Sequence, residues 1–417
     1  MTPFVHLHVH TPYSLLDSTC RIGDLVEAAA AQEVKAVAMT DHTVMYGALD
    51  FYRQCRERGV RPLIGCEMYV AREGLRDTRS ELEGNPNDHL VLLARDLDGY
   101  RNLVRLTSIA HLEGFHYKPR IDKEQLARYG KGLIGLSGCL QGEVNRLLLD
   151  DDEPGARRAA GAYAEIFGPN GFYLEFQDHG IPEQIKVNRA LGKLSKKTKI
   201  PIVATNDVHY LRREHASTHE LLLCVQTGTT MSDPARTRFP SSEFYLKTGD
   251  EMARLAREFP GAAARTVEVA EQCDVILPPP SRARPGVRQD CAASPELGGR
   301  HNRARIIAFK TFTAREAERT VLRAMNMPRE KWSERQGHTE PVDVRVADMA
   351  ARLEGNCRAF GVQEKGWVRR EQLLDGLIPL GRDKDGRPIT QYSEGHMREL
   401  GLLQTTDRQT NNMERTR

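Results

Sequence analysis

The sequence predicts an α/β fold, because short apolar runs typical of buried strands alternate with segments of helical periodicity. The predicted strands are residues 4–8, 35–40, 62–66, 89–94, 132–136, 172–176 and 200–205, each bounded by polar residues, Gly or Pro. A second observation is that side chains of metal-ligand type end most of these strands. A parallel α/β barrel gathers its chemistry from loops at the strand ends, so one common face is expected.

The helical patterns lie between several of these strands. They cover residues 24–30, 45–58, 156–167 and 183–197, and two closing helices are predicted at 250–259 and 262–273. The organisation changes near Pro278, Pro279 and Pro280. Residues 281–304 have little periodicity and several Pro, Gly and Ser, so they are predicted to be a linker.

Candidate metal ligands are spread over about two hundred positions. They are His8, His10, Asp17, His42, Glu67, His89, Cys139, Asp207 and His209. His8 and His10 alternate along a predicted strand and share a face, a pattern that alone is more often a hydrogen-bonded pair. Ligand-type residues recur at other strand ends, however, in TDH after KAVAM and in NDVH after PIVAT. This repetition predicts a metal site.

The ligand chemistry indicates which ions fit and what they can do. A mixture of His, carboxylate and one Cys suits zinc, iron or manganese better than magnesium or calcium. Clustered divalent ions lower the pKa of a bound water and polarise a phosphoryl oxygen, so no Ser or Cys nucleophile is required. The residue types therefore favour metal-dependent hydrolysis.

Six segments in order resemble motifs of the PHP (polymerase and histidinol phosphatase) domain of bacterial DNA polymerase III alpha subunits. They are FVHLHVHTPYSLLDS, VAMTDHTVMYGALDFY, RPLIGCEMYVA, DHLVLLARD, GLIGLSGCLQGEV and IVATNDVHYLRREHASTHELLLCVQTG. The resemblance covers residues 1 to about 278. It implies a distorted (β/α)7 barrel that holds up to three divalent ions, namely zinc, manganese or iron.

The resemblance also distributes the ligands among the ions. One metal takes His8, His10, Glu67 and Asp207, a second takes Glu67, His89 and Cys139, and a third takes Asp17, His42 and His209. Glu67 would then bridge two metals. His10, Glu67 and Asp207 are the residues we expect to be catalytic.

Two further features are candidates for substrate contact. The basic, aromatic segment HYKPR offers Lys118 and Arg120 to hold phosphate and Tyr117 to stack on a base. A solvated loop is the alternative interpretation. His179 in FQDHGIP follows a predicted strand and is expected near the same mouth.

Composition excludes several classes of protein. No run of 18 apolar residues and no signal pattern occur, so a cytoplasmic protein without membrane contact is expected. The eight cysteines form no C-x-x-C pair, which excludes a zinc ribbon. Residues 1–280 carry 34 Lys+Arg against 38 Asp+Glu, whereas residues 281–417 carry 26 against 19. The basic remainder suits contact with nucleic acid, although an unselected basic tail fits equally.

The last third resembles pieces of the polymerase palm but lacks the palm's chemistry. The family's paired carboxylates, which bind the two ions of nucleotidyl transfer, are replaced by RHNRAR before Ile306. The only D-x-D beyond residue 280 is Asp383-Lys384-Asp385, flanked by Gly and Pro as in a turn. The predicted domains are thus a PHP barrel at 1–280, a linker at 281–304 and a degenerate palm-like segment at 305–417. Residues 281–417 are expected to be partly disordered or loosely helical. Polymerase activity of the chain itself is not expected.

Three hypotheses follow for function. The first is a metal-dependent phosphoesterase, acting as a 3′–5′ exonuclease on DNA and working with DNA and other replicase subunits in replication. The second is a non-catalytic structural module of a replicative polymerase. The third is a phosphatase of small phosphomonoesters.

Overall fold

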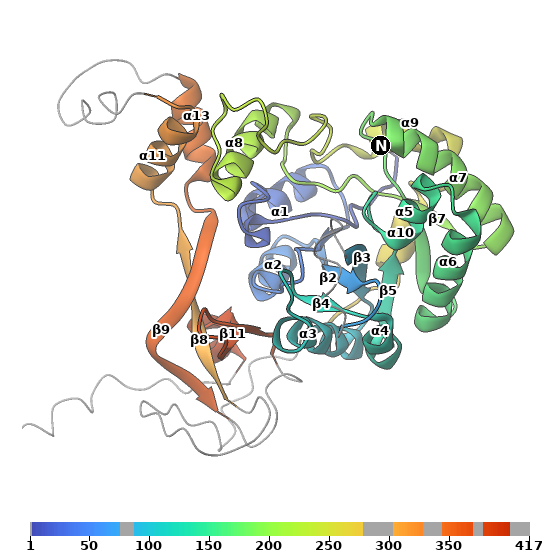
Figure 1. Cartoon of the computed structure of the whole chain (residues 1–417), viewed down its shortest axis with the longest axis horizontal. Coiled ribbons are helices and arrows are strands. Elements are labelled where there is room, and N and C mark those ends of the chain that lie inside the picture. The colour runs from blue at the N-terminus through green and yellow to red at the C-terminus, as the bar shows by residue number, and fades with distance from the viewer. Residues whose placement is uncertain (1, 76–86, 278–302, 328–343, 370–377, 401–417) are drawn as a thin grey trace, which may run out of the picture.

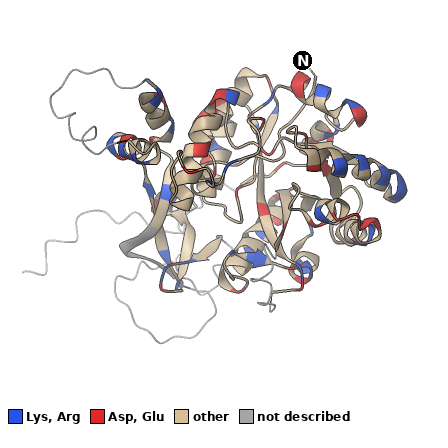
Figure 2. Cartoon of the chain, turned by 45° about the horizontal axis from the view of Figure 1, so that its top comes forward, with Lys and Arg blue, Asp and Glu red and all other residues tan. Residues whose placement is uncertain are grey.

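The computed structural model describes residues 2–75, 87–277, 303–327, 344–369 and 378–400, and only the backbone course of 361–369. The chain is a mixed α/β protein. Figure 1 shows a curled sheet surrounded by helices, with a second, smaller sheet to one side. Lys, Arg, Asp and Glu lie mostly on the helices and loops that surround the curled sheet (Figure 2).

The curled sheet has seven strands. They are β1 (Ala36–Met39), β2 (Arg61–Ala71), β3 (Asn87–Ala94), β4 (Arg120–Ile121), β5 (Leu133–Leu136), β6 (Phe172–Phe176) and β7 (Ile202–Ala204). Their order is β1-β2-β3-β5-β6-β7, with β4 beside β2. The sheet lies where the sequence predicts it, although β2 runs five residues further because Glu67–Ala71 stay buried.

The predicted strand at 4–8 is an extended segment rather than a regular strand. On one side, the carbonyl oxygen of His6 accepts a hydrogen bond from Ala38 N (2.9 Å). On the other side, the segment forms backbone hydrogen bonds with Val208. On that second side, His10 N donates to Val208 O (2.8 Å) and Val208 N donates to His8 O (3.1 Å). The segment therefore joins β1 to the residues after β7 and curls the sheet toward a barrel.

One strand departs from the expected parallel arrangement. β1–β2, β5–β6 and β6–β7 pair in parallel, but β3 is antiparallel to both β2 and β5. An antiparallel pair of strands, unlike a parallel pair, needs no crossover connection. The distortion of the barrel has its origin here.

Helices cover the outside of the sheet and one end of it. They are α1 (Ile22–Ala31), α2 (Ala48–Glu57), α3 (Leu97–Leu112), α4 (Lys123–Tyr129), α5 (Glu143–Leu149), α6 (Glu153–Phe167), α7 (Pro182–Thr198), α8 (Ala216–Thr227), α9 (Gly249–Leu255) and α10 (Arg265–Glu271). The barrel interior is filled by side chains such as Leu7, Leu63 and Leu136, against which Val269 and Ala270 of α10 pack. This end of the barrel is closed, and chemistry is confined to the other.

The C-terminal lobe consists of β8 (Arg303–Thr311), β9 (Cys357–Arg369), β10 (Leu380–Arg382) and β11 (Pro388–Ser393), in the order β10-β11-β8-β9. Helices α11 (Ala314–Ala324), α13 (Val344–Leu353) and α14 (Glu394–Glu399) accompany this sheet. The described part of 305–400 is thus a four-stranded sheet with three helices. Residues 281–302 of the predicted linker lie outside the described residues, and 303–304 already belong to β8.

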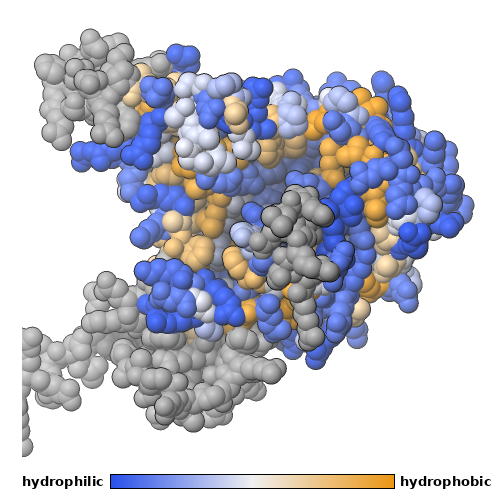
Figure 3. Space-filling view, viewed as in Figure 1, coloured by the Kyte–Doolittle hydropathy of each residue, from blue (hydrophilic) through white to orange (hydrophobic). Residues whose placement is uncertain are grey.

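The lobe packs on the barrel through buried contacts. Leu380 N donates to Ser108 Oγ of α3 (2.9 Å), and the hydroxyls of Tyr100 and Tyr392 are hydrogen-bonded. Tyr392 is completely buried. Helices α11 and α13 pack against α8 through apolar side chains such as Val321 and Leu221. Figure 3 shows a mostly hydrophilic outer face, on which apolar residues gather in recesses. Among the helices of the described residues, none is both long and apolar enough to cross a membrane.

We expect Tyr392→Ala to lower the free energy of unfolding by about 3–5 kcal/mol, because it removes a large side chain from the barrel–lobe contact. Tyr392→Phe should cost about 1 kcal/mol through the lost hydroxyl bond. Urea-induced unfolding measures both. Phe115→Ala is the control, since Phe115 is 56 % exposed and its loss should change stability by less than about 0.5 kcal/mol. Equal stability of Tyr392→Ala and the native chain would mean that the lobe does not pack on the barrel.

Candidate metal centre

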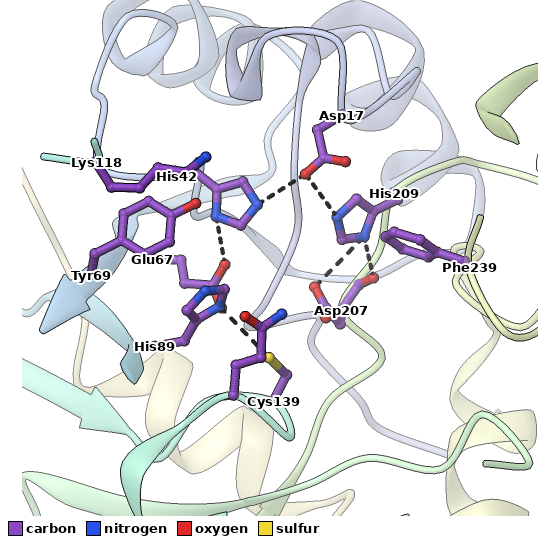
Figure 4. Close-up of a pocket in the computed structure, with 11 residues that line it drawn as sticks. Asp17, His42, Glu67, Tyr69, His89, Lys118, Cys139, Asp207, His209 and Phe239 are labelled. Carbon is purple, nitrogen blue, oxygen red and sulfur yellow. Dashed lines mark hydrogen bonds and ion pairs between the residues drawn. The ribbon is translucent and has the colours of Figure 1, made fainter. Parts of the chain in front are cut away.

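A cavity of about 260 Å³ opens at the mouth of the barrel. It is lined by Asp17, His42, Glu67, Tyr69, His89, Lys118, Cys139, Gln141, Asp207, His209 and Phe239 (Figure 4). Seven of the nine predicted ligands are in this lining. The other two, His8 and His10, are fully buried and contact Glu67 and Asp207 from below. The structure therefore brings all nine together.

Local structure explains how these side chains converge. Glu67 and His89 lie on the paired strands β2 and β3, and His42 follows β1 and bridges to Glu67 through the backbone. Asp207 follows β7 and has φ 45°, in the left-handed region that Asp tolerates better than most residues. This turn lets Asp207 and His209 both reach the cavity.

The first group of donor atoms is His8, His10 and Asp207. Nε2 of each histidine is 3.2 Å from Asp207 Oδ1, and the two Nε2 atoms are 3.2 Å apart. The Glu67 carboxylate lies 3.5 Å from His8 Nε2 and 3.4 Å from His10 Nε2. All four predicted ligands of the first metal thus surround one point.

Glu67 is also the centre of a second group. Its Oε1 is 2.9 Å from His89 Nδ1, and its Oε2 is 2.9 Å from His42 Nδ1. Cys139 Sγ lies 3.7 Å from His89 Nδ1. One carboxylate therefore faces four histidines, an arrangement suited to bridging two cations.

The third group surrounds Asp17. Asp17 Oδ2 is 3.0 Å from His42 Nε2 and 3.9 Å from His209 Nε2. The donor atoms of His10, His42 and His209 all lie within 4.8 Å of one another. This group shares His42 with the second one, so the three groups are contiguous.

Partners outside the cavity orient the first histidines. His8 Nδ1 donates to Glu175 Oε1 (2.7 Å), and Glu175 also accepts from Gly138 N (3.0 Å). His10 Nδ1 is 3.0 Å from Ser14 Oγ, which donates to Asp41 (2.6 Å). These bonds place a proton of each ring on Nδ1 and direct Nε2 toward the cluster.

His209 is oriented in the same way by a backbone group. Its Nδ1 lies 2.8 Å from the Asp207 carbonyl oxygen, to which the ring donates. The orientation of three rings is thus fixed before any ligand arrives, which lowers the cost of ordering a metal site.

Dense charge shifts the pKa values of the cluster. Burial alone would raise the pKa of the Glu67, Asp17 and Asp207 carboxyls, but the neighbouring histidines outweigh it and lower all three. Burial opposes protonation of His8, yet Asp207, Glu175 and Glu67 raise its pKa well above the usual value. Burial and the nearby His10 instead lower the pKa of His209 to about 3. These carboxylates are ionised at neutral pH and attract cations.

The arrangement fits metal ions. His42 Nδ1 and Asp207 Oδ1 are buried without an aligned hydrogen-bond partner, although each lies near an ionisable neighbour. A buried polar atom without a partner is costly, and a bound cation would satisfy both. The donor set of imidazole, carboxylate and one thiol matches zinc, iron or manganese.

Of the four residues predicted to contact substrate, one lines the cavity. Lys118 lines the cavity, whereas Tyr117, at φ 56° on the same turn, is 74 % exposed and outside the lining. Arg120 is buried on β4, where its guanidinium donates to the carbonyls of Gly114 (3.1 Å) and Leu75 (3.2 Å). His179 is buried and bonded to Gln184 (2.9 Å) and to the Asn206 carbonyl (3.0 Å). Neither Arg120 nor His179 is in the cavity lining, although the ring of His179 stacks on Phe244, next to the mouth.

Sequence reasoning missed several residues of the site. Tyr69 was detectable, because it follows Glu67 by two positions in a strand and must face the same side. Glu175 could also have been found, since it is a lone carboxylate in the apolar run FYLEF. Phe239 comes from a segment without periodicity, and no local signal points to it.

Comparisons with known proteins place part of the chain in a known domain family. The family described as the PHP domain matches residues 6–179 of the sequence. DNA polymerase III subunit alpha of Treponema pallidum is 43 % identical over 282 residues, 68 % of this chain and 24 % of that protein. The Thermus aquaticus subunit is 46 % identical over 282 residues, 66 % of this chain and 23 % of that protein. The chain thus spans about a quarter of the length of these relatives.

Two solved structures were also found at low similarity. A Bifidobacterium adolescentis protein assigned as a metal-dependent phosphoesterase aligns with TM-score 0.32 and 17 % identity, over 49 % of this chain and 87 % of that one. An amidohydrolase from Chromobacterium violaceum, with bound sulfate and no metal, aligns with TM-score 0.32 and 14 % identity over the same shares.

We expect Glu175→Gln and Glu175→Ala to weaken zinc or manganese binding by roughly 10–100-fold, with the larger loss for Ala, because His8 loses its orienting partner. Equilibrium dialysis followed by elemental analysis measures the affinity, and circular dichroism checks the fold. Glu183→Gln, an exposed change on α7, serves as the matched control. Unchanged metal affinity in both Glu175 variants would show that this carboxylate does not support the site.

Proposed function

We propose, from the premise that this chain carries a PHP domain, that it is a metal-dependent phosphoesterase acting as a 3′–5′ exonuclease on DNA. The single observation that carries this proposal is the convergence of nine donor residues on one cavity of about 260 Å³. The relatives at 43 % and 46 % identity are DNA polymerase III alpha subunits, which favours DNA over a small metabolite. DNA and other replicase subunits are accordingly the proposed partners.

The residues have distinct proposed roles. His8, His10, Glu67 and Asp207 would hold one ion, Glu67, His89 and Cys139 a second, and Asp17, His42 and His209 a third. Bound ions of this kind supply an activated water and neutralise charge on the phosphoryl oxygens. Zinc, manganese and iron are the candidates, because the donors mix nitrogen, oxygen and sulfur.

The chain itself supplies binding and orientation. Lys118 is the cationic residue of the lining and would hold the phosphate oxygens. His10, Glu67 and Asp207 are proposed as catalytic, since their donor atoms meet within 3.2–3.4 Å at His10 Nε2. Burial of these groups excludes bulk water and strengthens their electrostatic effect on the reacting phosphate.

A non-catalytic module and a phosphatase of small phosphomonoesters are the competing functions. One assay panel separates them. The full chain is loaded in turn with Zn²⁺, Mn²⁺ and Fe²⁺, then given a 3′-labelled single-stranded oligonucleotide and p-nitrophenyl phosphate. Metal-dependent release of mononucleotides from the 3′ end supports the proposal. Hydrolysis of the small ester alone selects the phosphatase, and no hydrolysis with either selects the structural module.

We expect His10→Ala and Asp207→Asn each to reduce the rate of hydrolysis by more than about 100-fold, because each removes a proposed metal ligand. Mutation of a residue that only hydrogen-bonds to a ligand typically costs roughly 10–100-fold. Native protein should hold more than one transition-metal ion per chain, and each variant should hold fewer. Elemental analysis and the oligonucleotide assay measure the two effects. Asp98→Asn, on the exposed face of α3, is the control. Full activity with normal metal content in both variants would exclude the assignment.

We expect the chain alone not to extend a primer with nucleoside triphosphates and Mg²⁺. Asp383, in the D-x-D beyond residue 280, accepts hydrogen bonds from the backbone N–H groups of Asp385 (2.9 Å) and Arg387 (2.8 Å) in the turn between β10 and β11. It also pairs with Arg305 (3.3 Å), so it is committed to structure rather than to metal. Primer extension by a preparation free of other polymerases would contradict this expectation.

A further inference from the structure

Two aromatic side chains and one lysine flank the metal-ligand cluster without belonging to it. Figure 4 shows Tyr69 and Lys118 on one side of the cavity and Phe239 on the opposite side. All three line the same space of about 260 Å³. These three side chains therefore limit which chemical groups the cavity can bind.

Lys118 is held in place and its charge remains available. The backbone N–H groups of His116 and Lys118 bond reciprocally to the carbonyls of the same two residues (3.0 and 2.6 Å), which pins the turn. Lys118 Nζ lies 5.5 Å from the centre of the Tyr69 ring, within cation–π distance. Among the described residues, no ion pair involves Lys118. A cation oriented in this way at a cavity mouth suits an anionic oxygen of the ligand.

Tyr69 is a fixed wall of this mouth. Its ring lies nearly parallel to that of His42 (16°, 5.8 Å between centres) and edge-on to that of His89 (81°, 5.0 Å). Buried on β2, it connects the ligand histidines with Lys118. Tyr69 is therefore a positioning residue for that lysine.

Phe239 offers an aromatic surface from the other side. Its ring is half-buried and meets the rings of His209, His219 and Phe244 at steep angles of 73°, 70° and 66°. Because Phe239 lines the cavity and is not fully buried, part of its ring is accessible to a planar group in that space. Flat stacking on an aromatic side chain is how proteins bind unpaired bases without sequence preference.

The size of the cavity limits what enters. Pockets that enclose a drug-sized molecule measure roughly 300–1,000 Å³, and this one is slightly smaller. The space is closer in size to a single nucleotide than to a base pair. An anion-binding lysine and an aromatic face on opposite sides of such a space match a phosphate joined to a base.

We propose that Phe239, Lys118 and Tyr69 form a subsite for a single unpaired nucleotide, with the base stacked on Phe239 and a phosphate oxygen held by Lys118. This inference rests on the proposed function and narrows its substrate to single-stranded or frayed 3′ ends. It also replaces Tyr117, whose ring is outside the lining, as the aromatic residue that contacts the base.

Direct binding tests the subsite independently of turnover. The full chain, reconstituted with Zn²⁺, is titrated calorimetrically with a phosphonate analogue of dAMP in which carbon replaces the bridging ester oxygen and prevents hydrolysis. Methylphosphonate, which lacks sugar and base, is the second probe. Phe239→Ala should weaken binding of the nucleotide analogue by roughly 5- to 150-fold, the range of one lost stacking contact, and leave methylphosphonate binding unchanged.

Lys118→Gln should weaken binding of both probes. Tyr117→Ala and Lys131→Gln are matched controls, because both side chains are exposed and outside the cavity lining, and neither should alter binding. Equal affinity of native protein and Phe239→Ala for the nucleotide analogue would overturn the subsite, as would a loss caused by Tyr117→Ala instead.

The two proposals fail in different ways. If the variants change nucleotide binding as expected but the native chain releases no nucleotide from DNA, the proposed function is wrong and the subsite stands. If the native chain digests single-stranded DNA and Phe239→Ala leaves both nucleotide binding and the KM for the oligonucleotide unchanged, the subsite is wrong and the function stands.

Discussion

The carboxylate of Glu67 imposes the constraint on which the site depends. It is 2 % exposed at the centre of a barrel mouth, and an ionised carboxylate in such a place is costly unless cations or donors surround it. Four histidines lie within 3.5 Å of its oxygens. These rings come from the N-terminal segment, from the end of β1 and from β3. The buried charge of Glu67 is therefore stabilised only when these three segments, which are distant in the sequence, pack together.

The geometry of the sheet follows from the same requirement. Because β3 runs antiparallel to β2, His89 stands opposite Tyr69 in the register, one alternation along the strand from Glu67. A parallel β3 would present the other end of that strand, where apolar side chains such as Leu92 and Leu93 lie, at the mouth of the barrel. The departure from a regular parallel barrel is therefore part of how the site is built.

Much of this could be predicted from residue patterns, and the remainder has identifiable physical reasons. The convergence of the nine side chains was predictable because ligand-type residues recur at strand ends, and because His8 and His10 share a face by simple alternation. Arg120 was not, since arginine is seldom buried and nothing local indicates that the carbonyls of Gly114 and Leu75 accept its hydrogen bonds. Phe239 reaches the cavity only through tertiary packing.

The C-terminal sheet was the least predictable part of the fold. In the sequence, the pieces of this sheet resemble a palm that lacks its central strands. In the structure, β8 pairs with both β11 and β9. These partners lie far apart in the chain, so no single segment predicts the pairing. The residues RHNRAR before Ile306 indicate that the paired carboxylates of the palm are absent from this position. They do not indicate whether the segment folds. A segment can lose a family's catalytic carboxylates and still retain the apolar residues that fold it.

That sheet also bears on the site, through the turn that carries Ser14. Phe309 of β8 packs against Tyr13 (5.2 Å) and Tyr46 (5.1 Å), next to the residues that orient His10 and follow His42. Met45 N donates to Gln391 Oε1 of β11 (2.8 Å), which ties the same loop to the lobe. Ser14 holds the ring of His10, so the position of that ring depends on a turn that the lobe covers. None of the described residues of the lobe lines the cavity, yet the lobe supports the backbone from which two of the proposed metal ligands extend.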